Sequence, residues 1–385
     1  MAKQADIIIA GAGLAGLCLA TGMAARPFFQ GKKILILDRD KKVKNDRTWC
    51  YWAVAGEKLP PVQCHTWNNA KFYGEAQFET NFELTPYQYH MVRGLDYYNW
   101  AKQNLTDHPN IEWLETEMLS IDSKTGTVHT THGDFQAEFV FNSALKNEPA
   151  PTSGYTQLLQ HFKGWVIETP EDQFDADQIT FMDYRLPQHG ETRFVYVLPL
   201  SKHSALVEFT VFSKSLLNDT DYDDALRQYV ASNLNIHTYR IKETEFGVIP
   251  MTDFPFPGKP GNVFHIGTAG GFVKGSSGYA YKRTHRKIEA FLDAWVKNRL
   301  PDKQLMRSSW RFRFYDSVML RVLNDSKVAG DRFFTLLFKL LPAPLVLKFL
   351  DEDTTFVQEL KLLSAPPTWP FLQTAFKQFS LFFRL

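Results

Sequence analysis

The sequence predicts an α/β protein in which a domain built on a parallel sheet is interleaved with a second β-sheet domain and followed by a helical C-terminal region. Three observations support this prediction. A strand, a glycine-rich turn and a helix open the chain, and a second glycine-rich turn follows a strand near residue 265. Between them lie stretches in which apolar and polar residues alternate, as in strands, and the chain beyond about residue 304 is apolar with prolines as breaks.

Length and composition agree with a two-domain globular protein. The chain has 385 residues, of which 44% are hydrophobic, enough for two cores. Lys and Arg number 43 against 42 Asp and Glu, so no nucleic-acid partner is expected. The 3 cysteines lack metal-ligand spacing and favour a reducing compartment, so no metal site is expected.

The first βαβ unit predicts a dinucleotide site. Residues 6–10 read as a buried parallel strand, a helix runs to about Arg26, and residues 33–38 form the second strand. Between strand and helix, the glycines allow a tight turn, close approach of a pyrophosphate, and helix–sheet packing. An acid at the end of the second strand suits a ribose diol. The predicted cofactor residues here are Gly11, Gly13, Leu14, Ala15, Gly16, Asp38 and Arg39.

The middle of the chain predicts neighbouring strands at 192–200 and 204–212, joined by the polar turn 201–203 and followed by a helix near 221–234. Further on, 262–271 read as a strand with a glycine-rich turn, and 276–297 as a helix. In the strand 204–212, Glu208 interrupts an apolar run and shares one face with Leu206 and Thr210. Without a family resemblance, this face of the strand would be expected to face solvent.

The second glycine cluster, His265 to Phe272 with Ser276 to Tyr279, resembles the flavin-contacting segment of two-dinucleotide-binding-type flavoproteins. That resemblance implies FAD in a Rossmann-like domain, with both ends of the chain meeting on one cofactor. It adds Gly267, Gly270, Gly271 and Gly278 to the predicted cofactor residues. Many such proteins have Gly-Asp at this turn, whereas this chain has Gly267-Thr268. The alternative is an ordinary turn between strand and helix.

An ordered set of short motifs is similar to bacterial FAD-dependent lycopene cyclases of the β-cyclase family, from the first strand to about residue 325. These motifs are Asn45 to Trp52, Met91 to Gly94, Phe181 to Arg185, Arg193 to Pro199, Ala205 to Thr210, Gly247 to Met251 and Ser276 to Tyr279.

The resemblance implies an isomerase of carotenoid biosynthesis that closes the ends of lycopene, or another linear carotenoid, into rings, most simply β rings. Such enzymes need reduced FAD, with NAD(P)H as reductant, and cause no net redox change. A proton adds to a terminal double bond, the cation closes the ring, and a proton leaves. This chemistry requires a carboxyl group of raised pKa, electron-rich groups near the cation, and exclusion of water.

The resemblance places an essential carboxylate at Glu208, which is the predicted acid. Many relatives carry a second acid directly after it, where this chain has Phe209. Asp183 is a second catalytic candidate, with pairing to Arg185 as its structural alternative.

Two arginines and several aromatic residues complete the predicted site. Arg93 resembles a cofactor-contacting arginine of related flavoproteins, and Arg47 is assigned the same role, with a salt bridge to Asp46 or Asp38 as its alternative. Aromatic faces for the cation are expected from Trp49, Trp52, Tyr196 and Tyr279, with core packing as the alternative.

The expected domain division assigns 1–80, 120–145 and 260–300 to the FAD domain, 81–119 and 146–259 to the substrate domain, and 301–385 to the helical region. Within that region, 333–341 and 379–385 are apolar, carry a basic residue each, and suit the plane of a membrane interface; a buried helix is the alternative. With no signal peptide and no spanning segment expected, the protein is predicted on the cytoplasmic side of the inner membrane, peripherally bound.

Two other functions share these features. An FAD-dependent oxidoreductase, such as a hydroxylase or an isoprenoid reductase, would use the same glycine motifs. A non-catalytic isoprenoid carrier would keep the fold, but it would not need the intact glycines and Asp38 of the cofactor site. The oligomeric state is not encoded in any pattern of the sequence.

Overall fold

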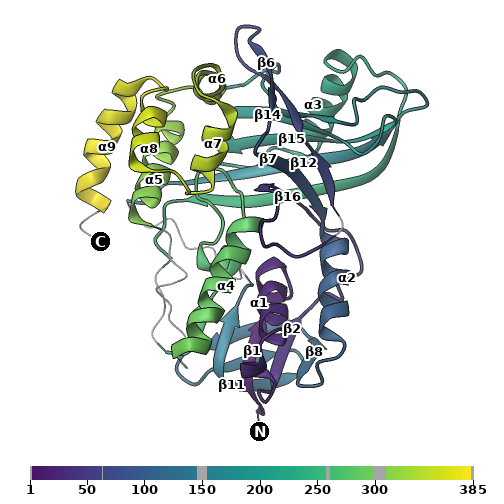
Figure 1. Cartoon of the computed structure of the whole chain (residues 1–385), viewed down its shortest axis with the longest axis vertical. Coiled ribbons are helices and arrows are strands. Elements are labelled where there is room, and N and C mark those ends of the chain that lie inside the picture. Colours follow the sequence, from purple (N-terminus) through teal and green to yellow (C-terminus); the bar gives the residue numbers. More distant parts are fainter. Residues whose placement is uncertain (1, 63, 145–153, 257–260, 299–308, 383–385) are drawn as a thin grey trace.

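The computed structural model describes residues 2–62, 64–144, 154–256, 261–298 and 309–382. Two layers built on large sheets lie one above the other in Figure 1, and the C-terminal helices flank the upper sheet. The N-terminal strand and helix belong to the lower layer. The described part of the chain contains no helix that is both long and apolar enough to cross a bilayer.

The lower sheet is parallel at its centre, in the order β8-β2-β1-β11-β10-β9, with β17 paired to β11. Its apolar strands are buried because helices α1, α2 and α4 cover one face. Their bounds are β1 Lys3–Ala10, β2 Ile34–Asp38, β8 Ile111–Glu115, β9 Met118–Asp122, β10 Thr127–Thr130, β11 Gly133–Asn142, β17 Val263–His265, α1 Leu14–Ala24, α2 Gly94–Leu105 and α4 Tyr281–Asn298. Two short 3₁₀ turns are η1 Pro27–Phe29 and η2 Gly267–Gly270.

The upper sheet has the order β16-β12-β15-β14-β13-β5-β6 and is antiparallel except for the β13–β5 pair. Helix α3 packs on one face, and side chains of α6 and α7 join the core on the other. The bounds are β5 Asn69–Tyr73, β6 Glu79–Glu83, β12 Gln157–Glu168, β13 Gln178–Asp183, β14 Thr192–Pro199, β15 Ser204–Ser213, β16 Arg240–Thr252 and α3 Asp219–Ser232.

A small antiparallel sheet, β3-β7-β4, lies between the two layers, and the helices α5 to α9 end the chain. The bounds are β3 Thr48–Val54, β4 His65–Trp67, β7 Tyr87–Arg93, α5 Trp310–Asn324, α6 Gly330–Leu340, α7 Ala343–Leu350, α8 Phe356–Leu363 and α9 Thr368–Phe382.

The predicted α/β class, the interleaved sheets and the helical C-terminal region are confirmed. Strand pairing differs from the expected domain division in two places. Strand β8, inside the stretch 81–119, pairs with β2 of the lower sheet, and β5, inside 1–80, pairs with β13 of the upper sheet. The chain passes between the two sheets more often than the motifs indicate. The sequence of a strand without a motif does not show which strand it pairs with.

Two helical predictions also differ in detail. Helix α4 begins at Tyr281 instead of 276, because Gly278 adopts a φ of +74° and the chain turns there. Residues 333–341, expected at a membrane surface, form most of α6, and four of their apolar side chains are buried in the core of the upper sheet: Phe334, Leu337, Phe338 and Leu341. Residues 383–385 of the second expected segment lie outside the described residues.

Candidate active site

The glycine turn after β1 has the form required to hold a pyrophosphate. A Cβ atom added at Gly16 would lie 1.9 Å from the carbonyl oxygen of Gly11, so only glycine lets α1 start here. A Cβ atom added at Gly13 would meet nothing within 4 Å, and no side chain caps the helix that follows. Leu14 and Ala15 are buried beneath the turn. The open turn and the uncapped N-terminus of α1 fit a bound phosphate group.

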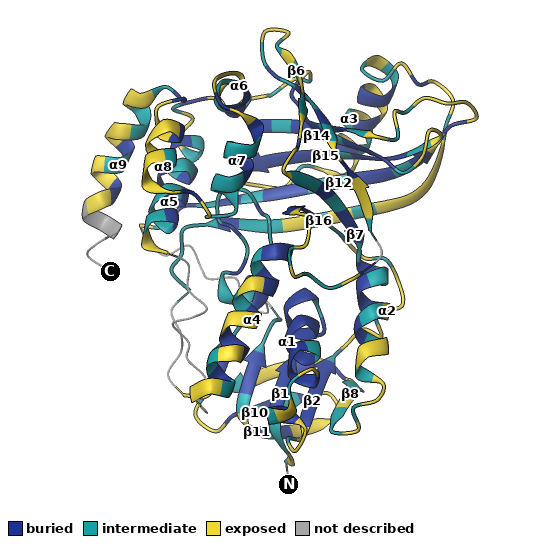
Figure 2. Cartoon of the chain, viewed as in Figure 1, coloured by how far each residue is buried: buried dark blue, intermediate teal, exposed yellow. Residues whose placement is uncertain are grey.

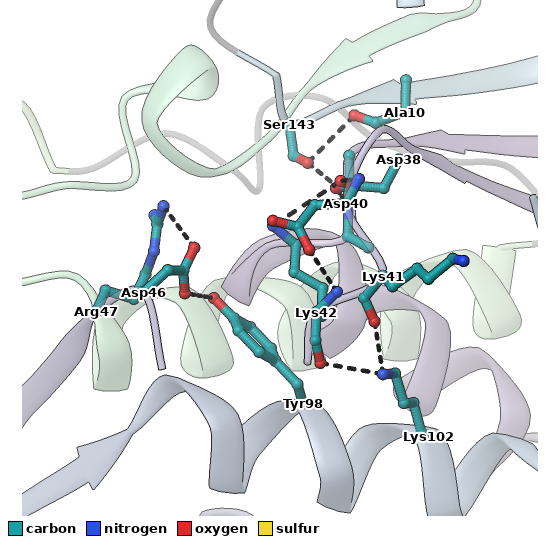
Figure 3. Close-up of polar contacts among 12 residues, drawn as sticks. Ala10, Asp38, Asp40, Lys41, Lys42, Asp46, Arg47, Tyr98, Lys102 and Ser143 are labelled. Carbon is teal, nitrogen blue, oxygen red and sulfur yellow. Dashed lines mark hydrogen bonds and ion pairs between the residues drawn. The ribbon is translucent and has the colours of Figure 1, made fainter. Parts of the chain in front are cut away.

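Asp38 fixes this turn from the end of β2. Its Oδ2 accepts a hydrogen bond from the Ala12 N–H at 2.6 Å, and its Oδ1 accepts one from Asp40 N–H at 2.8 Å. Figure 3 shows this contact region, with Lys42 reaching Asp38 at 3.8 Å and Ser143 donating to the carbonyl oxygens of Gly11 and Ala10. Arg39 is exposed beside it. The strand end thus brings an acid to the cofactor turn, as the sequence predicts.

Both predicted arginines form ion pairs. Arg47 is exposed and lies 3.2 Å from Asp46, whose other oxygen accepts a hydrogen bond from Tyr98 (Figure 3). This is the Arg47–Asp46 salt bridge that was the alternative to a cofactor contact. Arg93, at the end of β7, lies 2.6 Å from Glu243 of β16. Arg93 therefore ties the small sheet to the upper sheet, near the wall of a pocket that Thr48, Gly164 and Glu245 also line.

The second glycine segment meets the first. A Cβ atom added at Gly267 would lie 3.0 Å from the Cβ of Ala15, so the late turn packs on the start of α1. Gly270 and Gly271 continue this turn, and Gly278 leaves room for the side chain of Gln160 on β12. Two segments about 250 residues apart in the sequence therefore meet at one place, as FAD binding would require.

Asp183 lies away from this site. It is fully buried, takes three hydrogen bonds from the guanidinium group of Arg185 at 2.6–3.1 Å, and takes one from the Tyr229 hydroxyl at 2.7 Å. Tyr229 belongs to α3, so Asp183 faces that helix. The predicted catalytic role is not supported by these contacts, which are those of the structural ion pair that was its alternative.

Glu208 points to the opposite face of the upper sheet. Its neighbours Val207 and Phe209 pack under α3, whereas Leu206 and Phe212 join the core on the other face. By alternation, Glu208 belongs with the latter pair. Phe209, which stands where relatives carry a second acid, is therefore turned away from any site that Glu208 serves.

Aromatic side chains surround the Glu208 face. Tyr196 is its cross-strand neighbour on β14, and the Tyr196 hydroxyl lies 3.4 Å from that of Tyr279. Tyr279 in turn packs edge-on against Trp52 at 4.6 Å between ring centroids, and Phe181 packs against Tyr196 at 5.7 Å. Trp49 is different, because it packs on Tyr97 and Tyr281 in the lower core. Three of the four predicted aromatic residues thus gather near Glu208.

Sequence reasoning missed a second acid on the same face. Gly164 of β12 pairs with Glu208 on one side and with Glu245 of β16 on the other, so the two acids flank a residue without a side chain. Glu245 lies two residues before the Gly247 motif, on the same strand face, and this alternation was the available indication. The Thr48 hydroxyl donates to Glu245 at 2.7 Å, and the Thr210 hydroxyl donates to Glu208 at 3.1 Å.

The pKa of Glu208 is raised well above its ordinary value, first by burial among these rings and then by the negative charge of Glu245. The pKa of Glu245 is raised by burial, while the hydrogen bond from Thr48 opposes the rise. Glu208 is partly buried, and its strand partners Gly164 and, beyond it, Glu245 line a pocket. A neutral carboxylic acid against aromatic faces is the arrangement that can deliver a proton to carbon.

Solved structures share this fold, and one of them is described as flavin-dependent. A geranylgeranyl bacteriochlorophyll reductase-like protein from Thermoplasma acidophilum has a TM-score of 0.66 at 12% identity, covering 97% of this chain and 99% of its own. A flavin-dependent brominase has a TM-score of 0.56 at 12% identity, covering 98% and 99%. At such identities the likeness shows the fold alone.

Proteins related in sequence identify the family more specifically than the solved structures do. A lycopene beta-cyclase of Pseudescherichia vulneris is 22% identical over 383 residues, 95% of each chain. A chloroplastic lycopene beta cyclase of an Oncidium hybrid cultivar is 32% identical over 145 residues, which are 34% of this chain but only 30% of the plant protein. The family model described as lycopene cyclase protein matches residues 6–376, nearly the whole chain. This chain therefore belongs to the lycopene cyclase family.

Proposed function

We propose that this protein is a lycopene cyclase that closes the ends of lycopene, or a similar linear carotenoid, into β-type rings in carotenoid biosynthesis. The observation that carries the proposal is Glu208, an acid of raised pKa on a sheet face lined with aromatic rings. Family membership supports the substrate class, and the β ring follows the descriptions of the relatives. A neutral acid at this place suits a reaction that starts by protonating carbon.

FAD is the cofactor that the described residues fit, with NAD(P)H proposed as its reductant. The turn at Gly11 to Gly16 and the N-terminus of α1 would hold the pyrophosphate, and Asp38 the ribose. The turn at Gly267 to Gly271 would approach the flavin from the other side. When bound in its reduced form, the flavin would supply electron density and negative charge that can stabilise a cation on the substrate.

The chain's own residues perform the acid step. Glu208 donates its proton to a terminal carbon–carbon double bond, which leaves a tertiary cation on the substrate. The faces of Tyr196, Tyr279 and Trp52 stabilise that cation through their negative π surfaces. The same rings keep water from the cation, since water would trap it as an alcohol.

We also propose that the protein meets its substrate at the cytoplasmic surface of the inner membrane, through helices α8 and α9. Figure 2 shows long exposed stretches on both helices. Their charged residues are Glu359, which is buried, and Lys361 and Lys377, which are exposed. The apolar side chains exposed there are Phe356, Val357, Leu360, Leu363, Trp369, Leu372, Phe376 and Phe379. An apolar, weakly basic surface of this kind suits an anionic bilayer, where a carotenoid is dissolved.

Pigment analysis of a lycopene-accumulating bacterial host that expresses this chain tests the activity. We expect red lycopene to be converted into a carotene with β rings. The variant Glu208→Gln, a near-isosteric change, is expected to bind flavin normally and form no cyclic product, because an amide cannot donate the proton to carbon. Unchanged lycopene in the presence of soluble, flavin-loaded wild-type protein would contradict the proposal and favour an oxidoreductase. Full activity of Glu208→Gln would remove Glu208 from the mechanism.

A further inference from the structure

We infer that Glu245 is the base that removes the final proton in ring closure, and that Gly164 leaves the gap through which this proton returns to Glu208. The inference rests on the proposed cyclase function and deepens it. It assigns the second half of the proton transfer to a residue on a different strand from the predicted acid. It also explains how the chain manages without an acid at position 209.

The register of three strands brings the two carboxyl groups together. Glu208 on β15 and Glu245 on β16 are both direct partners of Gly164 on β12, the strand between them. Direct partners share one face of a sheet. Alternate strands lie about 9–10 Å apart, a span that two glutamate side chains can close only if the residue between them is small. A Cβ atom at position 164 would lie 3.0 Å from Glu245 Cγ and 3.3 Å from Glu245 Oε1, inside this gap.

The hydrogen bonds of Glu208 and Glu245 are complete only if one of the two acids carries a proton. Glu245 Oε2 accepts a hydrogen bond from the Thr48 hydroxyl, whereas Glu245 Oε1 is buried and, within the described part of the chain, has no donor while both acids are ionised. A buried carboxylate oxygen without a donor is costly. The carboxyl group of Glu208 is the group that interacts with Glu245. If Glu208 carries a proton, its O–H supplies the missing donor, and both acids are satisfied.

The surroundings decide which acid holds the proton. Glu245 receives the shorter hydroxyl contact, 2.7 Å against 3.1 Å for Glu208, and the charge of Arg93 favours its ionised form while Glu243 opposes it. Among the residues that the structure describes, the other titratable groups facing Glu208 are Cys50, Tyr196 and Tyr279, and burial raises the pKa of each, so all three stay neutral. The resting site is therefore one neutral acid, Glu208, and one carboxylate, Glu245.

The proton balance closes without an external donor. Glu208 gives its proton to the terminal double bond and becomes a carboxylate, and the substrate becomes a cation. The cation closes the ring by forming a new carbon–carbon bond. Glu245 then takes a proton from the carbon next to the cationic centre, and the C–H electron pair becomes the ring double bond. Finally the proton passes from Glu245 to Glu208 across Gly164, which restores the resting site with no net gain or loss of protons.

The test uses purified, FAD-loaded protein with lycopene-containing vesicles and a nicotinamide reductant, and measures initial rates of cyclic product between pH 5 and 9. We expect a bell-shaped profile for the wild type. Activity falls at high pH as Glu208 loses its proton, and at low pH as Glu245 gains one. Glu245→Gln is expected to lose about 100-fold or more in rate. Its low-pH limb should vanish, and its high-pH limb should move to lower pH, because Glu208 no longer has a negative neighbour.

Further variants separate this role from a structural one. Glu245→Asp should restore the low-pH limb with part of the rate. Gly164→Ala should lower the rate about tenfold with flavin binding intact, since its methyl group enters the gap. Glu168→Gln, which changes an exposed acid of the same sheet, is the control and should behave as wild type.

The outcomes distinguish the two proposals. An active Glu245→Gln with an unchanged pH profile would overturn the role of Glu245 and leave the cyclase function standing. A wild-type protein without cyclase activity would instead overturn the proposed function.

Discussion

Two acids on the upper sheet, Glu208 and Asp183, differ in role because they lie on opposite faces. Alternation from the buried Phe181 would place Asp183 on the Glu208 face. A bulge intervenes, however, since the register of β13 shifts between Thr180 and Asp183 and Met182 has a φ of +65°. A one-residue shift moves the next side chain to the other face. The bulge is what turns Asp183 toward Arg185 and Tyr229.

Asp183→Asn tests this assignment. Removal of the charge leaves the Arg185 guanidinium group and the buried Tyr229 hydroxyl poorly paired, so we expect the free energy of unfolding to fall by roughly 1–3 kcal/mol. Denaturant unfolding measures this change. The rate of cyclisation per folded molecule should stay near that of the wild type. A variant of normal stability without activity would return Asp183 to the catalytic residues.

At the scale of elements, the cofactor site depends on how closely α1 approaches the turn that precedes it. The approach occurs at Gly16, where the Gly11 carbonyl oxygen occupies the place of a side chain. Here the sequence was sufficient, because the spacing of three glycines between two apolar strands specifies both the turn and the packing. The spacing also predicted an acid at the end of the second strand; the structure places Asp38 against the Ala12 N–H, and its contact with a ribose stays a prediction.

Gly16→Ala is expected to abolish flavin binding, because its methyl group would push α1 away from the turn. The measurement is flavin absorbance per mole of purified protein. Gly31→Ala is the matched control, since a Cβ atom there meets nothing within 4 Å and the residue is exposed. Wild-type flavin content in Gly16→Ala would show that the pyrophosphate does not bind at this turn.

At the scale of the whole molecule, the C-terminal helices divide into buried and exposed parts. Helix α6 places most of its apolar side chains in the core of the upper sheet, whereas α8 and α9 keep most of theirs at the surface. Both kinds of helix are apolar in sequence, so composition does not separate them. The helices pack next to the sheet that carries Glu208 (Figure 1), which would bring the acid and the proposed membrane surface to the same part of the molecule.

The combined variant Trp369→Gln, Leu372→Gln and Phe376→Gln tests the surface in vesicle co-sedimentation. Burial of each side chain in a bilayer is worth roughly 1–2 kcal/mol, so we expect binding to anionic vesicles to weaken at least tenfold, with flavin content unchanged. The control changes three exposed apolar residues elsewhere to glutamine, namely Leu119, Leu216 and Ile241. Equal binding by the test variant and the wild type would exclude α9 as the contact surface.

The sequence by itself determined the α/β class, the glycine turns with Asp38, and the strand that carries Glu208, because each depends on neighbours within a few residues. The resemblance placed aromatic faces for the cation at Trp49, Trp52, Tyr196 and Tyr279, which stays a prediction, and it did not indicate that Trp49 packs in the lower core. Only the tertiary structure decided which strands share a sheet, that a bulge turns Asp183 away, and that Glu245 joins Glu208 across Gly164. The placement of Glu245 beside Glu208 depends on register between strands more than 35 residues apart, and a register is set by the packing of whole faces, which no local pattern contains.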